Sequence, residues 1–346
     1  MTTRGRRRAL RLAIVGFGSV GRRFAELLRG RYGRELRAAG VEPRVTAVAT
    51  ARHGRAVDPD GLPIARLLRR VRAGERIDPL HRGRPLTSTL ELIARAPADV
   101  VLELTPLDPA KGQPATAHVR RALERGCHVV TANKGPVAFA LGRLRGLARR
   151  RGRRFLFEGA VMDGTPVFNL ASRCLPGARV LGFRGLLNST TTRVLSRMEE
   201  GVPLAAALRE AQEAGVAEAD PRYDLDGWDA AVKGCAIANS LMGASIRPVN
   251  VDRQGIGTLS PGAAGAARAR GERLRLVVRG RREGRRVRVS VRPESLPLDD
   301  LLVSPGADGV LVLETDLMGE VGIWEGAGGV DQTAYALLSD LLTIVS

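Results

Sequence analysis

Lysine is rare in this chain, and two of its lysines fall in stretches whose residue types could do chemistry. Of the 55 Lys+Arg residues, only Lys111, Lys134 and Lys233 are lysines. Arginine stays protonated, whereas a lysine can exchange a proton, so a lysine in a motif suits acid–base chemistry. Lys233 follows Asp229 by four residues on a predicted helix, so the two side chains share a face. On the surface this pair would be worth about 0.3–0.5 kcal/mol, whereas a buried pair could pass a proton to a developing alkoxide.

The segment that precedes Lys233 is acidic although the protein is strongly basic. Residues 218–229 contain five carboxylates and one arginine, whereas the whole chain has a formal net charge of +19. An acidic pocket in a basic protein suits a cationic group such as a substrate ammonium. The alternative explanation is a solvated loop followed by acidic capping of a helix that begins at Gly227.

Two other polar stretches follow predicted strands. Residues 188–192, which include Thr190, either cap the next helix or present hydroxyl and N–H groups to a carboxylate. Together with the acidic segment, the second arrangement would recognise both ends of an amino acid. Lys134 lies in residues 131–136, after another strand, and ligands of open α/β sheets bind beyond the carboxyl ends of the strands. We therefore expect Lys134 to lie near a cofactor and a substrate.

A GxGxxG pattern follows the first predicted strand and opens the first predicted helix, which is the context that a dinucleotide-binding turn requires. Its first glycine permits the tight turn, its second lets the backbone approach a pyrophosphate, and its third lets helix and strand pack closely. The diphosphate would lie on the free N–H groups of the helix. A plain glycine-rich turn is the alternative. The residues of this predicted cofactor site are Gly16, Phe17, Gly18, Ser19, Val20 and Gly21.

The end of the second predicted strand favours NADP over NAD. An NAD-binding protein usually has an acidic residue at this point, where it holds the ribose hydroxyls. This chain has Arg52 instead, and an arginine there can pair with a 2′-phosphate. The alternative is that Arg52 is one of many arginines and has no specific role, so NAD also remains possible.

Regular elements alternate in the first part of the chain and position these motifs. Apolar runs predict strands at residues 11–15, 44–50, 99–104 and 127–131, and helical periodicity appears at 22–37, 64–71, 87–96 and 116–125. This alternation predicts a parallel, doubly wound sheet and an α/β fold class. After residue 136 the pattern changes. Further helices are predicted at 139–149, 194–200, 203–215, 227–242 and 332–342, and further strands at 154–157, 179–188, 274–278 and 286–291.

Composition limits the classes of partner. The chain is 44% hydrophobic and 26% charged, which suits a globular protein, and no apolar run approaches the roughly 20 residues of a membrane span. Its three cysteines are scattered, so we expect no disulfide framework and a cytoplasmic location. The arginines are spread along the whole chain and aromatic residues are few, so a solvated basic surface explains the charge better than a nucleic-acid partner.

Six stretches together resemble homoserine dehydrogenase and cover nearly the whole chain. The stretch at 211–233 is far more specific than the glycine motif. The resemblance implies the short form of the family, without the C-terminal ACT domain, and the NAD(P)-dependent interconversion of L-homoserine and L-aspartate 4-semialdehyde in threonine and methionine biosynthesis. The matching stretches are GFGSVG at 16–21, TANKGP at 131–136, EGAVMDGTP at 158–166, GLLNSTTTRVL at 185–195, AQEAGVAEADPRYDLDGWDAAVK at 211–233 and GAGGVDQTA at 326–334.

The resemblance also implies domains and a homodimer. An N-terminal Rossmann domain would span residues 1–136, and residues 317–346 would return to it. Residues 137–316 would form a second α/β domain that carries catalysis and, through its sheet, dimerisation.

Roles for particular residues follow from the same resemblance. Lys233 would donate the proton to the carbonyl oxygen, and Asp229 would hold Lys233 in place. Lys134 would assist in catalysis. The remaining implied residues are Glu218, Asp224 and Thr190 for the substrate, Thr105, Gly326 and Gly328 for the cofactor, and Glu158, Val161, Asp163 and Thr165 for a monovalent cation, usually sodium.

Two alternatives and one mechanistic choice stay open at this point. Another NADP-dependent Rossmann dehydrogenase could act on an amino-acid aldehyde, and one such class needs an activated cysteine nucleophile. An arginine-rich nucleic-acid-binding redox sensor would need a helix-turn-helix module, for which no segment is free. Lys233 could act either as a lysine whose pKa is lowered by burial or as an ammonium held by Asp229.

Overall fold

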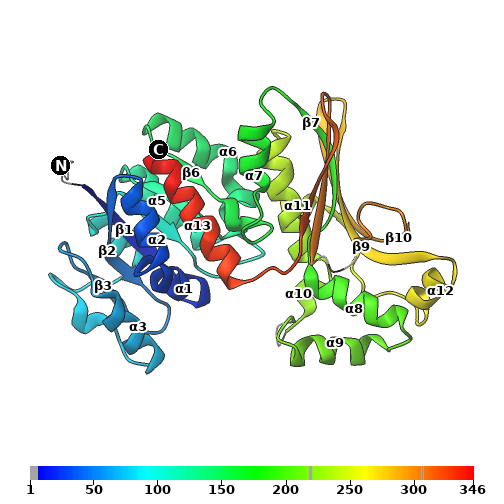
Figure 1. Cartoon of the computed structure of the whole chain (residues 1–346), viewed down its shortest axis with the longest axis horizontal. Coiled ribbons are helices and arrows are strands. Elements are labelled where there is room, and N and C mark those ends of the chain that lie inside the picture. The colour runs from blue at the N-terminus through cyan, green and yellow to red at the C-terminus, as the bar shows by residue number, and fades with distance from the viewer. Residues whose placement is uncertain (1–6, 218–219, 305, 307) are drawn as a thin grey trace. The chain divides into compact units, whose positions relative to one another are not determined.

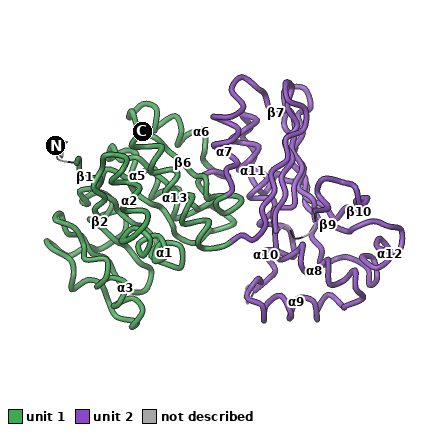
Figure 2. The backbone as a smooth tube through the Cα atoms, in the orientation of Figure 1, with its two compact units in different colours: residues 1–136, 140–164, 329–346 green, residues 137–139, 165–328 purple. Residues whose placement is uncertain are grey.

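The structure, a computed structural model of the whole chain, describes residues 7–217, 220–304, 306 and 308–346. The chain folds into two compact units (Figure 2). Unit 1 comprises residues 1–136, 140–164 and 329–346, and unit 2 comprises residues 137–139 and 165–328. The C-terminal segment thus completes the unit that the N-terminal segment begins.

Unit 1 is built on a six-stranded sheet of order β3-β2-β1-β4-β5-β6. All neighbouring strands are parallel except β3, which runs antiparallel to β2. The predicted parallel, doubly wound sheet is confirmed. Its strands are β1 (Arg8–Val15), β2 (Val41–Ala49), β3 (Arg55–Val57), β4 (Val100–Glu103), β5 (His128–Thr131) and β6 (Phe155–Leu156).

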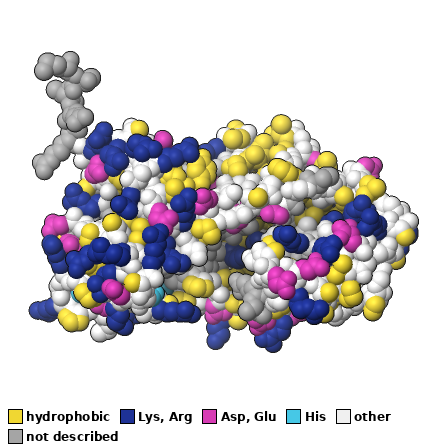
Figure 3. Space-filling model, turned by 60° about the horizontal axis from the view of Figure 1, so that its bottom comes forward, with side chains coloured by type: hydrophobic (Ala, Val, Ile, Leu, Met, Phe, Trp, Pro, Cys, Tyr) yellow, Lys and Arg dark blue, Asp and Glu magenta, His cyan; other side chains and the backbone are white. Residues whose placement is uncertain are grey.

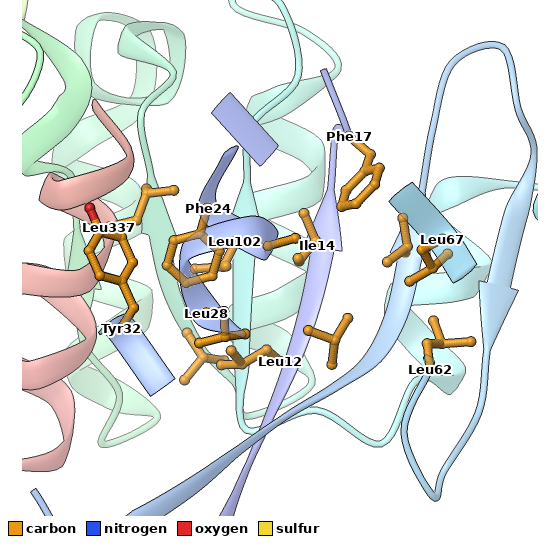
Figure 4. Close-up of a cluster of buried hydrophobic side chains, with 14 of the residues drawn as sticks. Leu12, Ile14, Phe17, Phe24, Leu28, Tyr32, Leu62, Leu67, Leu102 and Leu337 are labelled. Carbon is orange, nitrogen blue, oxygen red and sulfur yellow. The ribbon is translucent and has the colours of Figure 1, made fainter. Parts of the chain in front are cut away.

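Helices cover this sheet and include the last helix of the chain. Helix α13 lies beside α1 (Figure 1). Phe24 and Tyr32 pack together with ring centroids 6.1 Å apart, and both face Leu337 of α13 (Figure 4). The helices of unit 1 are α1 (Ser19–Leu28), α2 (Arg31–Ala38), α3 (Ile64–Arg72), α4 (Thr89–Arg95), α5 (Ala115–Glu124), α6 (Lys134–Arg150) and α13 (Val330–Val345), with short 3-10 helices η1 (Asp78–Leu80) and η2 (Glu158–Ala160).

Two predicted helices of unit 1 differ from the observed ones. The helix predicted at 22–37 is two helices, because the chain turns at Arg29 and Gly30 between α1 and α2. The helix predicted at 139–149 begins earlier, at Lys134, since the Asn133 side chain caps it by accepting a hydrogen bond from Gly135 N. Proline is tolerated in the first turn of a helix, so Pro136 does not prevent this start.

Unit 2 contains a second six-stranded sheet, of order β12-β11-β7-β9-β10-β8. Most neighbours are antiparallel, and only β8 runs parallel to its neighbour β10. Strands β11 and β12 form a hairpin that the sequence patterns did not predict. The strands are β7 (Val180–Leu186), β8 (Asp252–Arg253), β9 (Glu272–Glu283), β10 (Arg286–Pro297), β11 (Gly309–Thr315) and β12 (Gly319–Glu325).

Helix α11 (Trp228–Leu241) packs closely on this sheet. A Cβ atom at Gly234 would lie 2.7 Å from Val278 Cγ1 and 3.0 Å from Val289 Cγ1, so only glycine permits this approach to β9 and β10. No described helix is long and apolar enough to cross a membrane. The other helices of unit 2 are α7 (Val167–Asn169), the π-helix η3 (Leu170–Cys174), α8 (Ser189–Glu199), α9 (Leu204–Glu213), α10 (Arg222–Leu225), the 3-10 helix η4 (Pro248–Asn250) and α12 (Ala263–Ala269).

Candidate active site

The glycine motif forms the turn between β1 and α1, and each of its glycines has a different environment. Gly16 has a φ of +95°, and a Cβ atom there would lie 2.4 Å from the Leu104 carbonyl. A Cβ atom at Gly21 would lie 2.5 Å from Gly16 O, whereas one at Gly18 would enter open space. The tight turn and the close packing thus need Gly16 and Gly21, while the space beside Gly18 suits a ligand.

The start of α1 is suited to bind an anion. Gly18 is its N-cap, and within the described residues no side chain caps the helix. Ser19 is exposed at the first helical position, and Val20 is half-buried. Phe17 is buried in the core under the turn (Figure 4). The first N–H groups of α1 are therefore available for a diphosphate, as P–O⁻ groups favour the positive end of a helix dipole.

Arg52 lies in a short turn between β2 and β3. The Thr50 hydroxyl braces this turn, because it accepts a hydrogen bond from His53 N at 2.7 Å and donates one to Gly54 O at 3.1 Å. Arg52 is exposed and has no ion-pair partner among the residues that the structure describes. Because β2 lies next to β1 in the sheet, Arg52 and the glycine turn share the carboxyl-terminal edge of the parallel strands.

Thr105 and Lys134 follow β4 and β5 at the same edge. The Asn133 side chain links their two loops, since its Nδ2 donates to Thr105 O at 2.7 Å. Lys134 is the first residue of α6. The structure thus brings four groups of predicted cofactor residues to one sheet edge: the glycine turn, Arg52, Thr105 and Lys134.

Under this edge lies a buried carboxylate, Glu103, that our sequence analysis missed. Glu103 is fully buried at the end of β4. It accepts hydrogen bonds from the Thr105 hydroxyl and, at 3.3 Å, from Thr105 N. The Thr131 hydroxyl lies 3.4 Å from Glu103 Oε2, and His118 Nδ1 lies 3.3 Å from Oε1. A carboxylate within the apolar run VVLEL was the available signal, because a buried acid requires partners.

Lys233 of unit 2 is half-buried and held by two acceptors. Its Nζ lies 3.3 Å from Asp229 Oδ2 and donates to Leu187 O at 2.6 Å. Asp229 is 6% exposed. The two residues lie one turn apart on α11, as their spacing predicts. This pair is therefore a largely buried ion pair and not a surface pair.

Asp224 of α10 belongs to the same cluster. Asn188 Nδ2 donates to Asp224 Oδ1 at 2.7 Å and to Asp229 Oδ2 at 3.0 Å. Burial raises the pKa of the Asp224 carboxyl above its usual range, the negative charge of Asp229 raises it further, and hydrogen bonds from Asn188 and Thr190 oppose this. The predicted residues Asp224, Asp229, Lys233 and Thr190 thus lie together in unit 2. Glu218 lies outside the described residues.

Local backbone features set the approach of α8 and α10 to this cluster. Gly227 links α10 and α11 with a φ of +76°, a conformation that glycine adopts without strain. Thr190 is buried in the first turn of α8, where its hydroxyl donates to Val216 O at 3.2 Å. Asn188 is the N-cap of α8. The capping role that the sequence allowed for residues 188–192 is thus present in Asn188.

The other predicted residues are divided between the units. Gly326 and Gly328 belong to unit 2, where Asp308 contacts both: its N donates to Gly326 O at 3.0 Å, and its Oδ2 accepts from Gly328 N at 3.4 Å. Thr165, also in unit 2, donates to Glu325 Oε1 at 3.1 Å.

The remaining residues predicted for the cation lie in unit 1. Glu158 and Val161 are buried, and Asp163 has a φ of +40°. The described residues contain no group of three or more His, Cys, Asp or Glu side chains that could hold a metal ion.

Two of the three cysteines, Cys127 and Cys235, do not resemble activated nucleophiles. Burial raises the pKa of the Cys235 thiol to about 12, and burial also raises the pKa of Cys127. A reactive cysteine has the opposite property, a lowered pKa. Cys174 is exposed on the π-helix η3. The raised pKa values of Cys127 and Cys235 argue against either of them as the nucleophile of a cysteine-dependent aldehyde dehydrogenase.

Basic side chains are dispersed over the face of the molecule that Figure 3 shows. On the face shown in Figure 3, Lys and Arg side chains alternate with acidic ones. Several of the arginines form ion pairs, such as Arg23 with Asp331 and Arg197 with Glu210. This distribution is typical of a solvated charged surface.

Two family models match the chain. The model described as "Homoserine dehydrogenase, NAD binding domain" matches residues 16–158, and the model "Homoserine dehydrogenase" matches residues 166–342. These ranges include both clusters described above.

Individual relatives match over nearly their full length. The chain is 36% identical to an NAD(+)-dependent homoserine dehydrogenase of Pseudomonas canavaninivorans, over 96% of each chain. It is similar to a crystal structure of an Archaeoglobus fulgidus protein, with a TM-score of 0.85 and 35% identity, covering 97% of this chain and 99% of the other. A hyperthermophilic archaeal homoserine dehydrogenase in complex with NADPH has a TM-score of 0.81 and 26% identity, covering 97% of both chains.

Proposed function

The chain belongs to the homoserine dehydrogenase family, oxidoreductases that interconvert L-homoserine and L-aspartate 4-semialdehyde with a pyridine nucleotide, and from this we propose that Lys233 transfers the proton in that reaction. The observation that carries the proposal is the largely buried pair of Lys233 with Asp229, with Asp224 in the same cluster.

The nucleotide, when bound, accepts or supplies the hydride. Lys233 then gives a proton to the carbonyl oxygen as the aldehyde is reduced, and takes one from the hydroxyl as homoserine is oxidised. The Asp229 carboxylate and the Leu187 carbonyl are both acceptors, and both favour the charged ammonium form. We therefore favour an ammonium held by Asp229, rather than a neutral, desolvated lysine, as the form that reduces the aldehyde. In homoserine oxidation this ammonium first releases its proton to solvent, and the neutral amine then takes the hydroxyl proton.

Substrate recognition is proposed for the same cluster. Asp224 and Glu218 would together bind the substrate ammonium. The Asp224 carboxylate is half-buried, and both its burial and the nearby charge of Asp229 make its ionised form unfavourable. An added cation relieves that cost. Thr190 would lie against the substrate at the start of α8.

For the nucleotide we propose NADP, with NAD as a weaker cofactor. The open space at Gly18 and the uncapped start of α1 fit a diphosphate. The exposed guanidinium of Arg52 suits the 2′-phosphate. Thr105 and Lys134 would lie near the nicotinamide, and Gly326 and Gly328 would also contact the cofactor. Among relatives, one is named NAD(+)-dependent and another binds NADPH, so the preference is tested by comparing kcat/KM for the two nucleotides.

A monovalent cation, most simply sodium, is proposed near Glu158, Val161, Asp163 and Thr165. These residues offer carbonyl and carboxyl oxygens, the donors that hard cations prefer. Replacing sodium with a bulky organic cation should then lower activity, and equal activity in both salts would remove this site.

We further propose a homodimer formed through the sheet of unit 2. Its β11–β12 hairpin exposes large apolar side chains, Leu317 at 71%, Met318 at 61% and Trp324 at 54%, and such side chains mark interfaces. Light scattering should report the mass of two chains.

The three free cysteines accord with a reducing cytoplasm, where threonine and methionine are made.

The decisive experiment uses two lysine variants. Lys233→Ala should lower kcat for homoserine oxidation by about 10³-fold, because proton transfer by a positioned group contributes this much. Lys111→Ala is the matched control, since Lys111 is exposed, and should retain wild-type kcat. Circular dichroism should show that both variants are folded. The proposal fails if folded Lys233→Ala keeps kcat within a few-fold of the wild type.

A further inference from the structure

One neutral side chain, Asn188, joins the two carboxylates of the unit 2 cluster. It follows β7 and is 7% exposed. Its Nδ2 donates to Asp224 Oδ1 at 2.7 Å and to Asp229 Oδ2 at 3.0 Å. An amide carries two N–H donors on this nitrogen, so each carboxylate receives one of them.

The orientation of this amide is fixed by the helix that it caps. Asn188 Oδ1 accepts from Thr191 N at 2.9 Å, and Asn188 O accepts from the hydroxyls of Thr191 at 3.0 Å and Thr192 at 3.1 Å. A flipped amide would direct N–H groups at Thr191 N and its oxygen at two carboxylates. The cap therefore turns the donors of Asn188 toward Asp224 and Asp229.

The bridge also reaches Lys233. The Asp229 oxygen that accepts from Asn188 is the oxygen that lies 3.3 Å from Lys233 Nζ. A carboxylate bound by two donors at one oxygen has little freedom to rotate. The other acceptor of Lys233 is the carbonyl oxygen of Leu187, the residue before Asn188. Both acceptors of the Lys233 ammonium are therefore positioned by Asn188 or by its neighbour in the chain.

Without a donor between them, two neighbouring carboxylates would repel each other, and the usual result is that one binds a proton. Burial and, after it, the negative charge of Asp229 raise the pKa of Asp224, whereas the hydrogen bond from Asn188 lowers it. Among the described residues, the charged groups of the cluster are Asp224 on α10 and Asp229 and Lys233 on α11. The amide thus offsets the repulsion without adding charge.

We propose that Asn188 is the positioning residue of this active site: its amide holds Asp224 and Asp229 side by side as two ionised carboxylates and thereby aims the Lys233 ammonium at the substrate. The inference rests on the proposed function and deepens it. One residue links the ammonium-binding carboxylate with the proton-donating lysine. Substrate binding and proton transfer therefore depend on the same amide.

The variant Asn188→Asp separates positioning from capping. Aspartate caps a helix as well as asparagine does and has the same shape, but it replaces the shared donor with a third carboxylate. We expect kcat to fall about 10²-fold at neutral pH, the size of a misplaced reactive group, and KM for homoserine to rise. KM for the nucleotide should stay unchanged. Activity should recover as the pH falls, because the introduced carboxyl group, once protonated, again donates a hydrogen bond.

Two further variants make the experiment decisive. Asn250→Asp adds the same charge at an exposed position and should leave kcat and both KM values unchanged. Asn188→Ser keeps a capping acceptor but cannot bridge the carboxylates, so it should lower kcat about tenfold even if Asn188→Asp does not fold. Wild-type kcat in a folded Asn188 variant would overturn the inference. If Lys233→Ala is also fully active, the proposed function itself has failed, so the two failures are distinguishable.

Discussion

Each unit has a buried cluster of polar side chains beside a proposed binding region. The two clusters differ in how many carboxylates they hold and in which groups donate hydrogen bonds to them. In unit 1, the single carboxylate of Glu103 is surrounded by the hydroxyls of Thr105 and Thr131, a backbone N–H and an imidazole. In unit 2, the carboxylates of Asp224 and Asp229 share the two donors of one amide, with one ammonium beside them.

The difference indicates separate tasks. Glu103 carries one charge, and its donors, the hydroxyl and the N–H of Thr105, lie within the same unit, so these hydrogen bonds fix the loop that carries Thr105. The unit 2 cluster has two negative charges and one positive one among its described residues, and burial already raises the pKa of Asp224. An additional cation would stabilise it. The first cluster therefore suits positioning of a loop, and the second suits binding of a charged substrate.

The strongest test of this comparison is Asp229→Asn. The variant keeps the shape of the side chain and its bond with Asn188 but removes the counter-charge of Lys233. We expect kcat to fall about 10²–10³-fold, since proton transfer then loses its oriented donor, while the free energy of unfolding changes little. Steady-state kinetics and urea unfolding measure the two effects.

Asp226→Asn provides the control for that change, because Asp226 is an exposed acid of the same segment. It should leave kcat unchanged. If the two variants lose activity equally, general electrostatics of the acidic segment explain the loss, and the contrast between the clusters disappears.

Glu103→Leu is expected to lower mainly the free energy of unfolding, whereas Asp229→Asn lowers mainly kcat. The leucine leaves the N–H and the hydroxyl of Thr105 without their acceptor, and each buried unsatisfied group costs about 1–3 kcal/mol. We expect the free energy of unfolding to drop by about 2 kcal/mol and KM for the nucleotide to rise, with kcat changed less. Glu103→Gln, which retains an acceptor oxygen, should restore most of both. An unchanged unfolding midpoint in Glu103→Leu would contradict the positioning role.

Local patterns predicted much of the fold and several members of each cluster. The parallel sheet followed from alternating apolar runs and helical periodicity, and the i, i+4 spacing placed Asp229 and Lys233 together because both lie on one helix. The predicted turn at Gly16 also needed only the local motif, which specifies where the chain must take a positive φ.

Contacts between distant residues could not be predicted in this way. Asn188 meets Asp224 and Asp229, 36 and 41 residues away in sequence, only because the fold brings the end of β7 beside α10 and α11. Similarly, the place of His118 beside Glu103 depends on how α5 covers β4. The break between α1 and α2 was missed because the apolar periodicity continues from Phe24 to Leu36 across Gly30.

The smallest predicted effect concerns the pH dependence of stability in Asp224→Asn. The folded pKa of Asp224 is raised above its ordinary value of 3.8, so the wild-type folded state loses stability as the pH rises through the window between 3.8 and the folded pKa. The asparagine variant lacks this loss. Its stability relative to wild type should therefore be lowest in acid and grow with pH until that window is passed.

Asp220→Asn should show the opposite sign. A hydrogen bond from Arg222 lowers the pKa of exposed Asp220 to about 2, so that carboxylate stabilises the folded state above pH 3.8, and the contribution disappears as the pH falls through about 2. Solvent screening makes this effect small. Urea unfolding across the pH range compares the two variants. Parallel curves would mean that Asp224 carries no burial cost, and the unit 2 cluster would then be as fully satisfied as the one around Glu103.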